Sequence, residues 1–251
     1  MNKSYFTILQ ELTKKLLLMG NSCNTTPEKT SCSITDTGCK TTNNTDNLGE
    51  YWCGKYTDVD YKKLGWYEEI SSPTLKLIEK TNLKKDAIIF SVGAGSTTLI
   101  DTLLDKDYSN LIANDISSCA LNNIKKRIGE KQNNVQFIVD DLVNPSILNK
   151  LPKVDLWNDR AVLHFFIEKN DQDSYFKLLK DKVKKNGFVI LAEFNLQGAT
   201  KCSGLPVKRY NTQMLQKKLG NDFKLIDNFD YDYTMPSGEI RKYVYTLFKR
   251  V

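Results

Sequence analysis

The sequence predicts an α/β fold with a mostly parallel β-sheet and one antiparallel edge. Two observations predict it. Short apolar runs alternate with helical segments from about residue 87 to residue 219, which is typical of parallel strands joined by crossover helices. Two further strand-like segments then follow one another, and Pro236-Ser237-Gly238 between them is a turn signal, so the chain should end in an antiparallel hairpin.

The expected elements follow one another along the chain. Helices should precede and separate the strands, and Ser117 should cap the third of them, with Ser72 capping the first. The strands are expected at 87–92, 111–114, 135–139, 154–158, 188–192, 223–233 and 241–249. The helices are expected at 73–78, 99–104, 120–128, 175–183 and 212–219.

Three domains are expected. Residues 1–19 predict an N-terminal helix because Phe6, Leu9, Leu12 and Leu16 share one helical face. Residues 20–50 are rich in Thr, Ser and Asn and nearly lack apolar side chains, so we expect a flexible, low-complexity linker. Residues 51–251 form the folded domain.

Composition limits the classes of function. The chain of 251 residues is 40% hydrophobic and 26% charged, an ordinary balance for a globular protein. No apolar run approaches the roughly 20 residues of a membrane helix, so we expect a cytoplasmic protein without a membrane partner. We also expect a monomer or homodimer. The net charge is +6, yet no basic block is interleaved with aromatic residues, and we therefore expect no nucleic-acid partner.

The cysteines do not predict a metal site. None of the six forms a Cys-x-x-Cys pair, and His164 is the single histidine of the sequence. Without a secretory signal, reduced thiols are the expectation.

A glycine turn follows the first expected strand. In an open α/β sheet ligands bind beyond the carboxyl ends of the strands. Gly93 and Gly95, with Ala94 between them, allow a tight turn and a close approach to a ligand, and the next helix presents N–H groups that suit an anion. A purely structural strand-to-helix turn explains the same residues.

Acidic residues end the next two strands. Asp115 lies 20 residues after Gly95, the spacing at which a carboxylate meets ribose hydroxyls, although it also suits a helix cap. Asp141 stands where a carboxylate accepts a hydrogen bond from an adenine amine, or else lies in a solvated loop. A dinucleotide is disfavoured because Thr98 occupies the third glycine position.

A family resemblance covers residues from about 51 to 251. The chain resembles a bacterial branch of the class I S-adenosylmethionine-dependent methyltransferases, with broader similarity to thiopurine, tellurite-resistance and protein-lysine methyltransferases. The matching stretches are Trp52…Tyr56, Gly65-Trp66-Tyr67, Ser91 to Asp101, Asn114 to Ser117, Asp155 to Phe166 and Cys202 to Tyr210.

The resemblance implies a fold, a cofactor and its contacts. The fold would be a Rossmann-like sheet of seven strands in the order 3-2-1-4-5-7-6, and the cofactor S-adenosylmethionine, released as S-adenosylhomocysteine. The glycine turn would face its methionine part, Asp115 and Asp141 its ribose and adenine. Ser91 stands where the family usually carries an acidic residue. The implied cofactor residues are Ser91, Gly93, Ala94, Gly95, Asp115, Ile116, Asp141, Leu142 and Asn158.

The catalytic candidates would lie beside the transferable methyl group. Asp159 orients the acceptor or acts as a base, or instead pairs with Arg160. His164 takes part in catalysis, or is a packing residue beside Phe165 and Phe166.

The aromatic residues before the first strand either wall the acceptor pocket or belong to the core, and Cys202 either touches a soft substrate atom or is a plain loop residue. The expected pocket residues are Trp52, Tyr56, Trp66, Tyr67, Cys202 and Arg209.

Four functions compete. Our first hypothesis is methyl transfer to a small molecule through a thiol, amine, hydroxyl or related soft nucleophile. The second is protein-lysine methylation. Nucleic-acid base methylation is third, because Asn158-Asp159-Arg160-Ala161 lacks the Asn/Asp-Pro-Pro-aromatic motif of amino-directed enzymes. A degenerate fold that only binds a ligand is the non-enzyme alternative, and Ser91 keeps it open.

Overall fold

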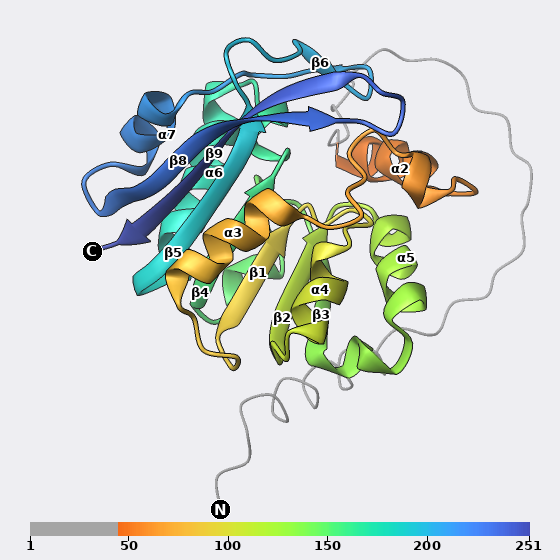
Figure 1. Cartoon of the computed structure of the whole chain (residues 1–251), viewed down its shortest axis with the longest axis horizontal. Coiled ribbons are helices and arrows are strands. Elements are labelled where there is room, and N and C mark those ends of the chain that lie inside the picture. Colours follow the sequence, from red (N-terminus) through yellow and green to blue (C-terminus); the bar gives the residue numbers. More distant parts are fainter. Residues whose placement is uncertain (1–44) are drawn as a thin grey trace, which may run out of the picture. The chain divides into compact units, whose positions relative to one another are not determined.

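The computed structural model describes residues 45–251 (Figure 1). The N-terminal helix expected at 1–19, and residues 20–44 of the expected linker, lie outside the described residues. The first described helix, α2 (Thr45–Tyr56), begins before the domain start expected at Tyr51. None of the described helices is both long and apolar enough to cross a membrane.

A seven-stranded sheet carries the fold, in the order β3-β2-β1-β4-β5-β9-β8. The first five strands along the chain pair in parallel, and β9 lies antiparallel between β5 and β8. The predicted order and C-terminal hairpin are confirmed; the final strands carry higher numbers because a small hairpin, β6–β7, precedes them. The strands are β1 (Ile88–Val92), β2 (Asn110–Asp115), β3 (Val135–Val139), β4 (Val154–Arg160), β5 (Val183–Phe194), β6 (Lys201–Cys202), β7 (Leu205–Pro206), β8 (Phe223–Thr234) and β9 (Ile240–Arg250).

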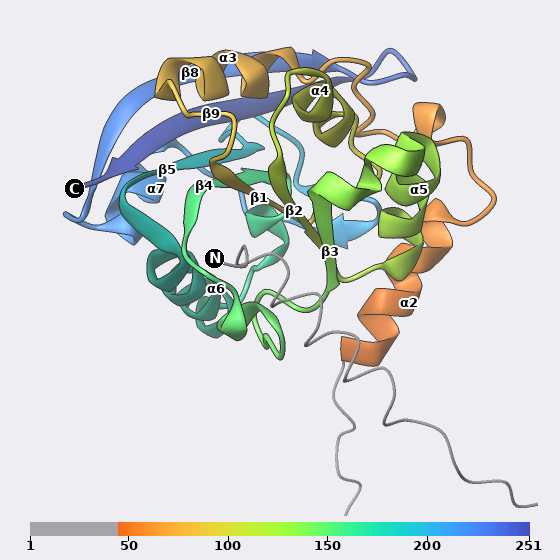
Figure 2. The ribbon, with the colours of Figure 1, turned by 90° about the horizontal axis from the view of Figure 1, so that it is seen from below.

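Helices cover both faces of the sheet (Figure 2). One apolar cluster joins the sheet to α3, α4 and α5, and a second joins its other face to α6 and α7. The helices are α3 (Ser72–Thr81), α4 (Leu99–Asp105), α5 (Ser118–Ile128), α6 (Lys169–Lys182) and α7 (Thr212–Leu219). Short 3-10 turns lie at Tyr61–Lys63, Gly129–Asn134, Leu148–Lys150 and Leu163–Phe165.

Helix starts follow local chemistry, with small shifts from the prediction. Ser117 caps α5 as expected, since its side chain accepts a hydrogen bond from the Ala120 N–H. Helix α3 begins one residue early, at Ser72, so Ser71 takes the cap position and Pro73 lies in the first turn.

One expectation about the cysteines is wrong. Cys53 on α2 and Cys119 on α5 form a disulfide, with their Cα atoms 5.1 Å apart. The two residues are 66 positions apart in the sequence, and only the packing of α2 beside α5 brings them together. Among the described residues Cys202 is a free thiol.

Candidate functional site

A cavity of about 390 Å³ opens at the carboxyl ends of β1, β2 and β4. Its wall combines the turn after β1, the ends of β2 and β4, the loop after β3, helix α2 and the hairpin β6–β7. This is the edge of an open α/β sheet at which ligands bind. Every expected cofactor residue lines the cavity, namely Ser91, Gly93, Ala94, Gly95, Asp115, Ile116, Asp141, Leu142 and Asn158.

The glycine turn leaves no room for side chains at its two glycines. Gly93 and Gly95 have φ values of 49° and 57°, in the left-handed region that glycine tolerates. A Cβ at Gly93 would lie 2.2 Å from Cγ2 of Val162, and one at Gly95 would lie 2.7 Å from the Tyr56 hydroxyl. The two glycines therefore let Val162 and the Tyr56 hydroxyl pack directly against the backbone of the turn, which lines the cavity.

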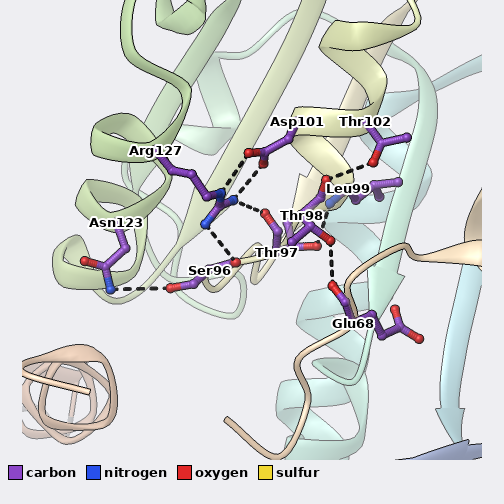
Figure 3. A network of polar contacts seen from close by, with 9 residues as sticks. All are labelled: Glu68, Ser96, Thr97, Thr98, Leu99, Asp101, Thr102, Asn123 and Arg127. Atoms are coloured by element: carbon purple, nitrogen blue, oxygen red, sulfur yellow. Dashed lines mark hydrogen bonds and ion pairs between the residues drawn. The ribbon is translucent and has the colours of Figure 1, made fainter. Parts of the chain in front are cut away.

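Arg127 of α5 holds this turn in place (Figure 3). Its guanidinium donates to the carbonyl oxygens of Ser96 and Thr97, at 3.2 and 2.5 Å, and pairs with Asp101 of α4 at 2.7 Å. From the other side, the Thr98 hydroxyl donates to the Glu68 carbonyl at 2.7 Å. The turn is therefore fixed from two directions by contacts within the protein.

The Asp115 carboxylate accepts backbone hydrogen bonds and also lines the cavity. Its Oδ2 accepts from the Gly95 N–H at 2.8 Å, and its Oδ1 accepts from the Ser117 N–H at 2.8 Å, so it supports the turn before α5. It also lines the cavity and is 6% exposed. Burial raises its pKa to about 6, against the lowering effect of these backbone hydrogen bonds. Each oxygen keeps a second lone pair for a ligand hydroxyl.

Asp140 and Asp141, the acidic pair after β3, make different contacts. The Asp140 carboxylate accepts from the backbone N–H groups of Ser146, Ile147 and Leu148, and so anchors the following loop. Asp141 accepts from the Val143 N–H at 2.9 Å, and partial burial raises its pKa. Of the two, Asp141 is the carboxylate with capacity left for a ligand at this end of the cavity.

Two buried polar atoms on β1 and β4 have no hydrogen-bond partner. Ser91 of β1 and Asn158 of β4 occupy paired positions in the parallel register. They are 2% and 5% exposed, and neither Ser91 Oγ nor Asn158 Oδ1 has a hydrogen-bond partner. Unpaired buried acceptors are costly, and both residues line the cavity, so their arrangement suits a ligand that donates hydrogen bonds.

Arg160 lines the cavity without pairing with Asp159. Its Nη2 lies 3.2 Å from Oε1 of Glu68, while Nη1 and Nε donate to the Trp66 carbonyl and the Tyr245 hydroxyl, each at 3.1 Å. Successive residues of a strand face opposite sides of the sheet, so Asp159 points away from Arg160. The alternative in which Asp159 pairs with Arg160 is therefore wrong.

Asp159, unlike Arg160, does not line the cavity. It is 0% exposed and accepts from the Val162 and Leu163 N–H groups at 3.0 and 3.2 Å and from the Tyr175 hydroxyl at 2.5 Å. Burial raises its pKa to about 6, and burial followed by the Asp159 charge raises that of Glu193. The structure supports neither alternative for Asp159, which instead fixes the backbone after β4.

His164 follows the packing alternative. It is 0% exposed, and its ring lies 4.5 Å from that of Phe165 and 4.7 Å from that of Phe194, measured between centroids. Burial, and then the Arg160 charge, lower its pKa to about 3. The imidazole is therefore neutral, and it does not line the cavity, which is a correction to its place among the catalytic candidates.

The aromatic residues of the N-terminal segment line the cavity as expected. Trp52 meets Trp66 and Phe165 edge to face, and Tyr56 meets Trp66 in the same way, with centroids 5.1 to 6.1 Å apart. Tyr67 lies on the same wall. They also form a small apolar cluster, so wall and packing roles coincide.

Of the two pocket candidates in loops, Cys202 and Arg209, the structure places only the first at the cavity. Cys202 lines the cavity, and burial raises the pKa of its thiol. Arg209 does not line it; its guanidinium donates to the carbonyl oxygens of Leu196 and Gly198 at 2.8 and 3.4 Å. Arg209 is thus a loop anchor, which corrects the prediction that it belongs to the pocket.

Several lining residues carry no motif that could have marked them. They come from the segment after α2 and from the ends of β5, β8 and β9, which only the folded sheet brings together. These residues are Glu68, Phe194, Met235, Arg241 and Tyr243. Glu68 follows the quoted Gly65-Trp66-Tyr67 stretch, which is the nearest signal in the sequence.

A comparison with curated proteins found a similar methyltransferase. The chain is 30% identical over 163 residues to EEF1A lysine methyltransferase 2 from Danio rerio, which covers 58% of this chain and 68% of the relative. No protein-family model matches the chain.

Solved structures share the fold. An S-adenosylmethionine-dependent methyltransferase from Anabaena variabilis matches with a TM-score of 0.65 at 13% identity, covering 87% of this chain and 99% of the other. Magnesium protoporphyrin IX methyltransferase from Synechocystis, with bound S-adenosylmethionine, matches with a TM-score of 0.61 at 14% identity, covering 86% and 100%.

The chain therefore belongs to the class I S-adenosylmethionine-dependent methyltransferases. Within that class it is similar to the zebrafish lysine methyltransferase, while the narrower bacterial branch remains a prediction from the sequence.

Proposed function

We propose that this protein binds S-adenosylmethionine in the cavity and transfers its methyl group to a small molecule. When bound, the cofactor supplies an electrophilic methyl group on a sulfonium. The observation that carries the proposal is the set of cavity groups at four neighbouring strand ends, those of β3, β2, β1 and β4. Each has unused hydrogen-bonding capacity that matches one part of the cofactor.

The match runs from one end of the cavity to the other. The cofactor's ammonium donates hydrogen bonds, and Ser91 Oγ and Asn158 Oδ1 are buried acceptors without partners. The glycine turn lines the cavity between these groups, and we assign the methionine part to it. Asp115 accepts from the ribose hydroxyls, and Asp141 from the adenine amine. In this assignment two neutral acceptors replace the acidic residue that relatives usually carry at Ser91.

The acceptor end favours a substrate that enters as a nucleophile. Asp159 and His164, the two candidate bases, are both buried away from the cavity. Glu68 is a lining carboxylate, but its pairing with Arg160 makes it a poor base. Since none of these three groups is available as a base, the cavity aligns the acceptor and excludes water rather than removing a proton, which suits a thiolate, a neutral amine or another soft nucleophile.

A small acceptor also suits the enclosure of the site. Leu48, Trp52 and Tyr56 of α2 line one wall, and Tyr51 of the same helix donates a hydrogen bond to the Ser203 carbonyl of the β6–β7 hairpin. Helix and hairpin are thereby joined beside the acceptor end. A folded protein substrate would have to insert a side chain past this junction.

Protein-lysine methylation is the second candidate, and the zebrafish relative favours it. Transfer of labelled methyl from S-adenosylmethionine separates the two. Purified protein would be incubated with host lysate and a panel of small thiols and amines, and products divided into volatile, small soluble and acid-precipitable fractions. Label in the first two supports the proposal, whereas label confined to the acid-precipitable fraction refutes it, and a single labelled protein band there favours lysine methylation.

A further inference from the structure

Helix α2 forms part of the cavity wall although it precedes the sheet in the chain. Trp52 and Tyr56 project from it into the aromatic cluster beside the glycine turn, and the Tyr56 hydroxyl lies over Gly95. Figures 1 and 2 both show α2 alongside α5. A ligand in the cavity is therefore partly enclosed by α2, and entry and exit depend on where this helix lies.

Few contacts hold α2 in that position. The Asn123 side chain of α5 donates to the Tyr56 carbonyl at 3.1 Å, and Tyr51 donates to the Ser203 carbonyl. Its apolar contacts belong to a small cluster separate from the two main cores. The one covalent attachment among the described residues is the disulfide between Cys53 and Cys119.

Both cysteines are partly exposed. Each is half-buried rather than enclosed in the core. Cys119 lies in the first turn of α5, where the helix dipole stabilises a negative charge and hence a thiolate. The Cα separation of 5.1 Å lies within the usual range for disulfides, so the bond can form without moving the two helices apart.

We propose that Cys53 and Cys119 form a reversible redox site that controls the release of α2 from the cavity. In oxidation, one cysteine thiolate attacks a low-molecular-weight disulfide and expels one thiol. The second cysteine then attacks the mixed disulfide and expels the other. Two electrons and two protons pass from the cysteine pair to the reagent, and a dithiol reverses the reaction.

The two states differ in the freedom of α2. The disulfide closes a loop of 66 positions and ties α2 to α5, so the helix cannot leave the cavity without carrying α5 with it. In the dithiol state the weak contacts above remain alone, and local opening becomes easier. The effect on cofactor exchange rests on the proposed function, whereas the bond and its effect on α2 do not.

The test uses the full chain in which Cys23, Cys32 and Cys39 are replaced by Ser, so that these thiols cannot compete. One sample is oxidised with glutathione disulfide and the other reduced with dithiothreitol. Non-reducing peptide mapping reads the bond, and hydrogen exchange reads the amides of α2, with those of α6 as an internal reference. We expect a Cys53–Cys119 peptide after oxidation, and exchange in α2 slowed about tenfold or more while α6 is unchanged.

Cys53→Ser and Cys119→Ser in the same background are the matched variants. Under either treatment, α2 in both variants should exchange as fast as it does in the dithiothreitol-treated parent protein. Oxidation that yields no Cys53–Cys119 peptide would overturn the proposal, and so would equal α2 exchange in the two states.

Release of S-adenosylhomocysteine, followed by tryptophan fluorescence, should be about tenfold slower in the oxidised protein. A linked peptide and slowed α2 exchange without any ligand binding would refute the proposed function and leave the redox site standing. Binding with equal release rates in the two states would refute control of the cavity.

Discussion

Replacing Asp115 with Ala is expected to weaken binding of S-adenosylhomocysteine strongly. The carboxylate is 6% exposed, and each oxygen holds one backbone N–H and keeps one lone pair for a ribose hydroxyl. A hydrogen bond to a charged group contributes about 1.5–3 kcal/mol. Losing two such bonds amounts to about 3–6 kcal/mol, which corresponds to roughly 10²- to 10⁴-fold in Kd.

Isothermal titration calorimetry measures this change directly. Asp105→Ala is the matched control, because Asp105 lies on α4 in an exposed ion pair with Lys131 and outside the cavity, and its Kd should stay within about twofold of the wild type. Circular dichroism confirms that each variant is folded. Unchanged affinity in a folded Asp115→Ala protein would refute the placement of the ribose at this carboxylate.

Four further predictions concern Asp115, Gly93 and His164. Because the ionised Asp115 accepts both hydroxyls and burial raises its pKa to about 6, affinity for S-adenosylhomocysteine should fall as the pH drops through about 6; a flat profile from pH 8 to 5 would contradict this. The raised pKa of Asp115 makes the free energy of unfolding depend on pH in the opposite direction to ligand binding. The contribution of Asp115 to stability is full below its ordinary pKa of 3.8 and is lost as the pH rises through about 6. Gly93→Ala should lower the free energy of unfolding by about 1–3 kcal/mol in urea titration, because the new Cβ meets Val162 at a positive φ; an unchanged midpoint would show that the turn relaxes freely. His164→Phe should keep methyl transfer within about fivefold of the wild type, since a neutral ring packed between two phenylalanines is replaced by another ring; a loss of a hundredfold or more would return His164 to the catalytic candidates.

The fold followed from local sequence signals that the structure bears out. Apolar runs of strand length, separated by helical periodicity, predicted the parallel strands, and Pro236-Ser237-Gly238 predicted the final hairpin. Ser117 marked the start of α5 because capping depends on neighbouring residues alone. The cofactor candidates were brought together for a related reason, since the carboxyl ends of parallel strands meet at one edge of the sheet.

The catalytic candidates were less predictable because side-chain direction decides their role. Asn158, Asp159 and Arg160 are consecutive, and a strand turns every second one to the opposite face. Asn158 and Arg160 face the cavity, so Asp159 is directed into the core beneath it. The sequence motif contains all three without distinguishing them.

Long-range contacts were also invisible to the sequence. The partner of Arg160 is Glu68, which is 92 positions earlier and belongs to a segment without regular structure. The Cys53–Cys119 bond likewise depends on how α2 packs against α5. In both cases nothing in the spacing of the residues indicated the pairing.

A crystal structure with S-adenosylhomocysteine would test the proposed cofactor site most directly. We expect the ligand in the cavity beneath α2, with its ammonium within hydrogen-bond distance of Ser91 Oγ and Asn158 Oδ1. Its ribose hydroxyls should contact Asp115 and its adenine amine Asp141. A ligand bound elsewhere, or an ammonium held by groups other than Ser91 and Asn158, would contradict the assignment on which the proposed function rests.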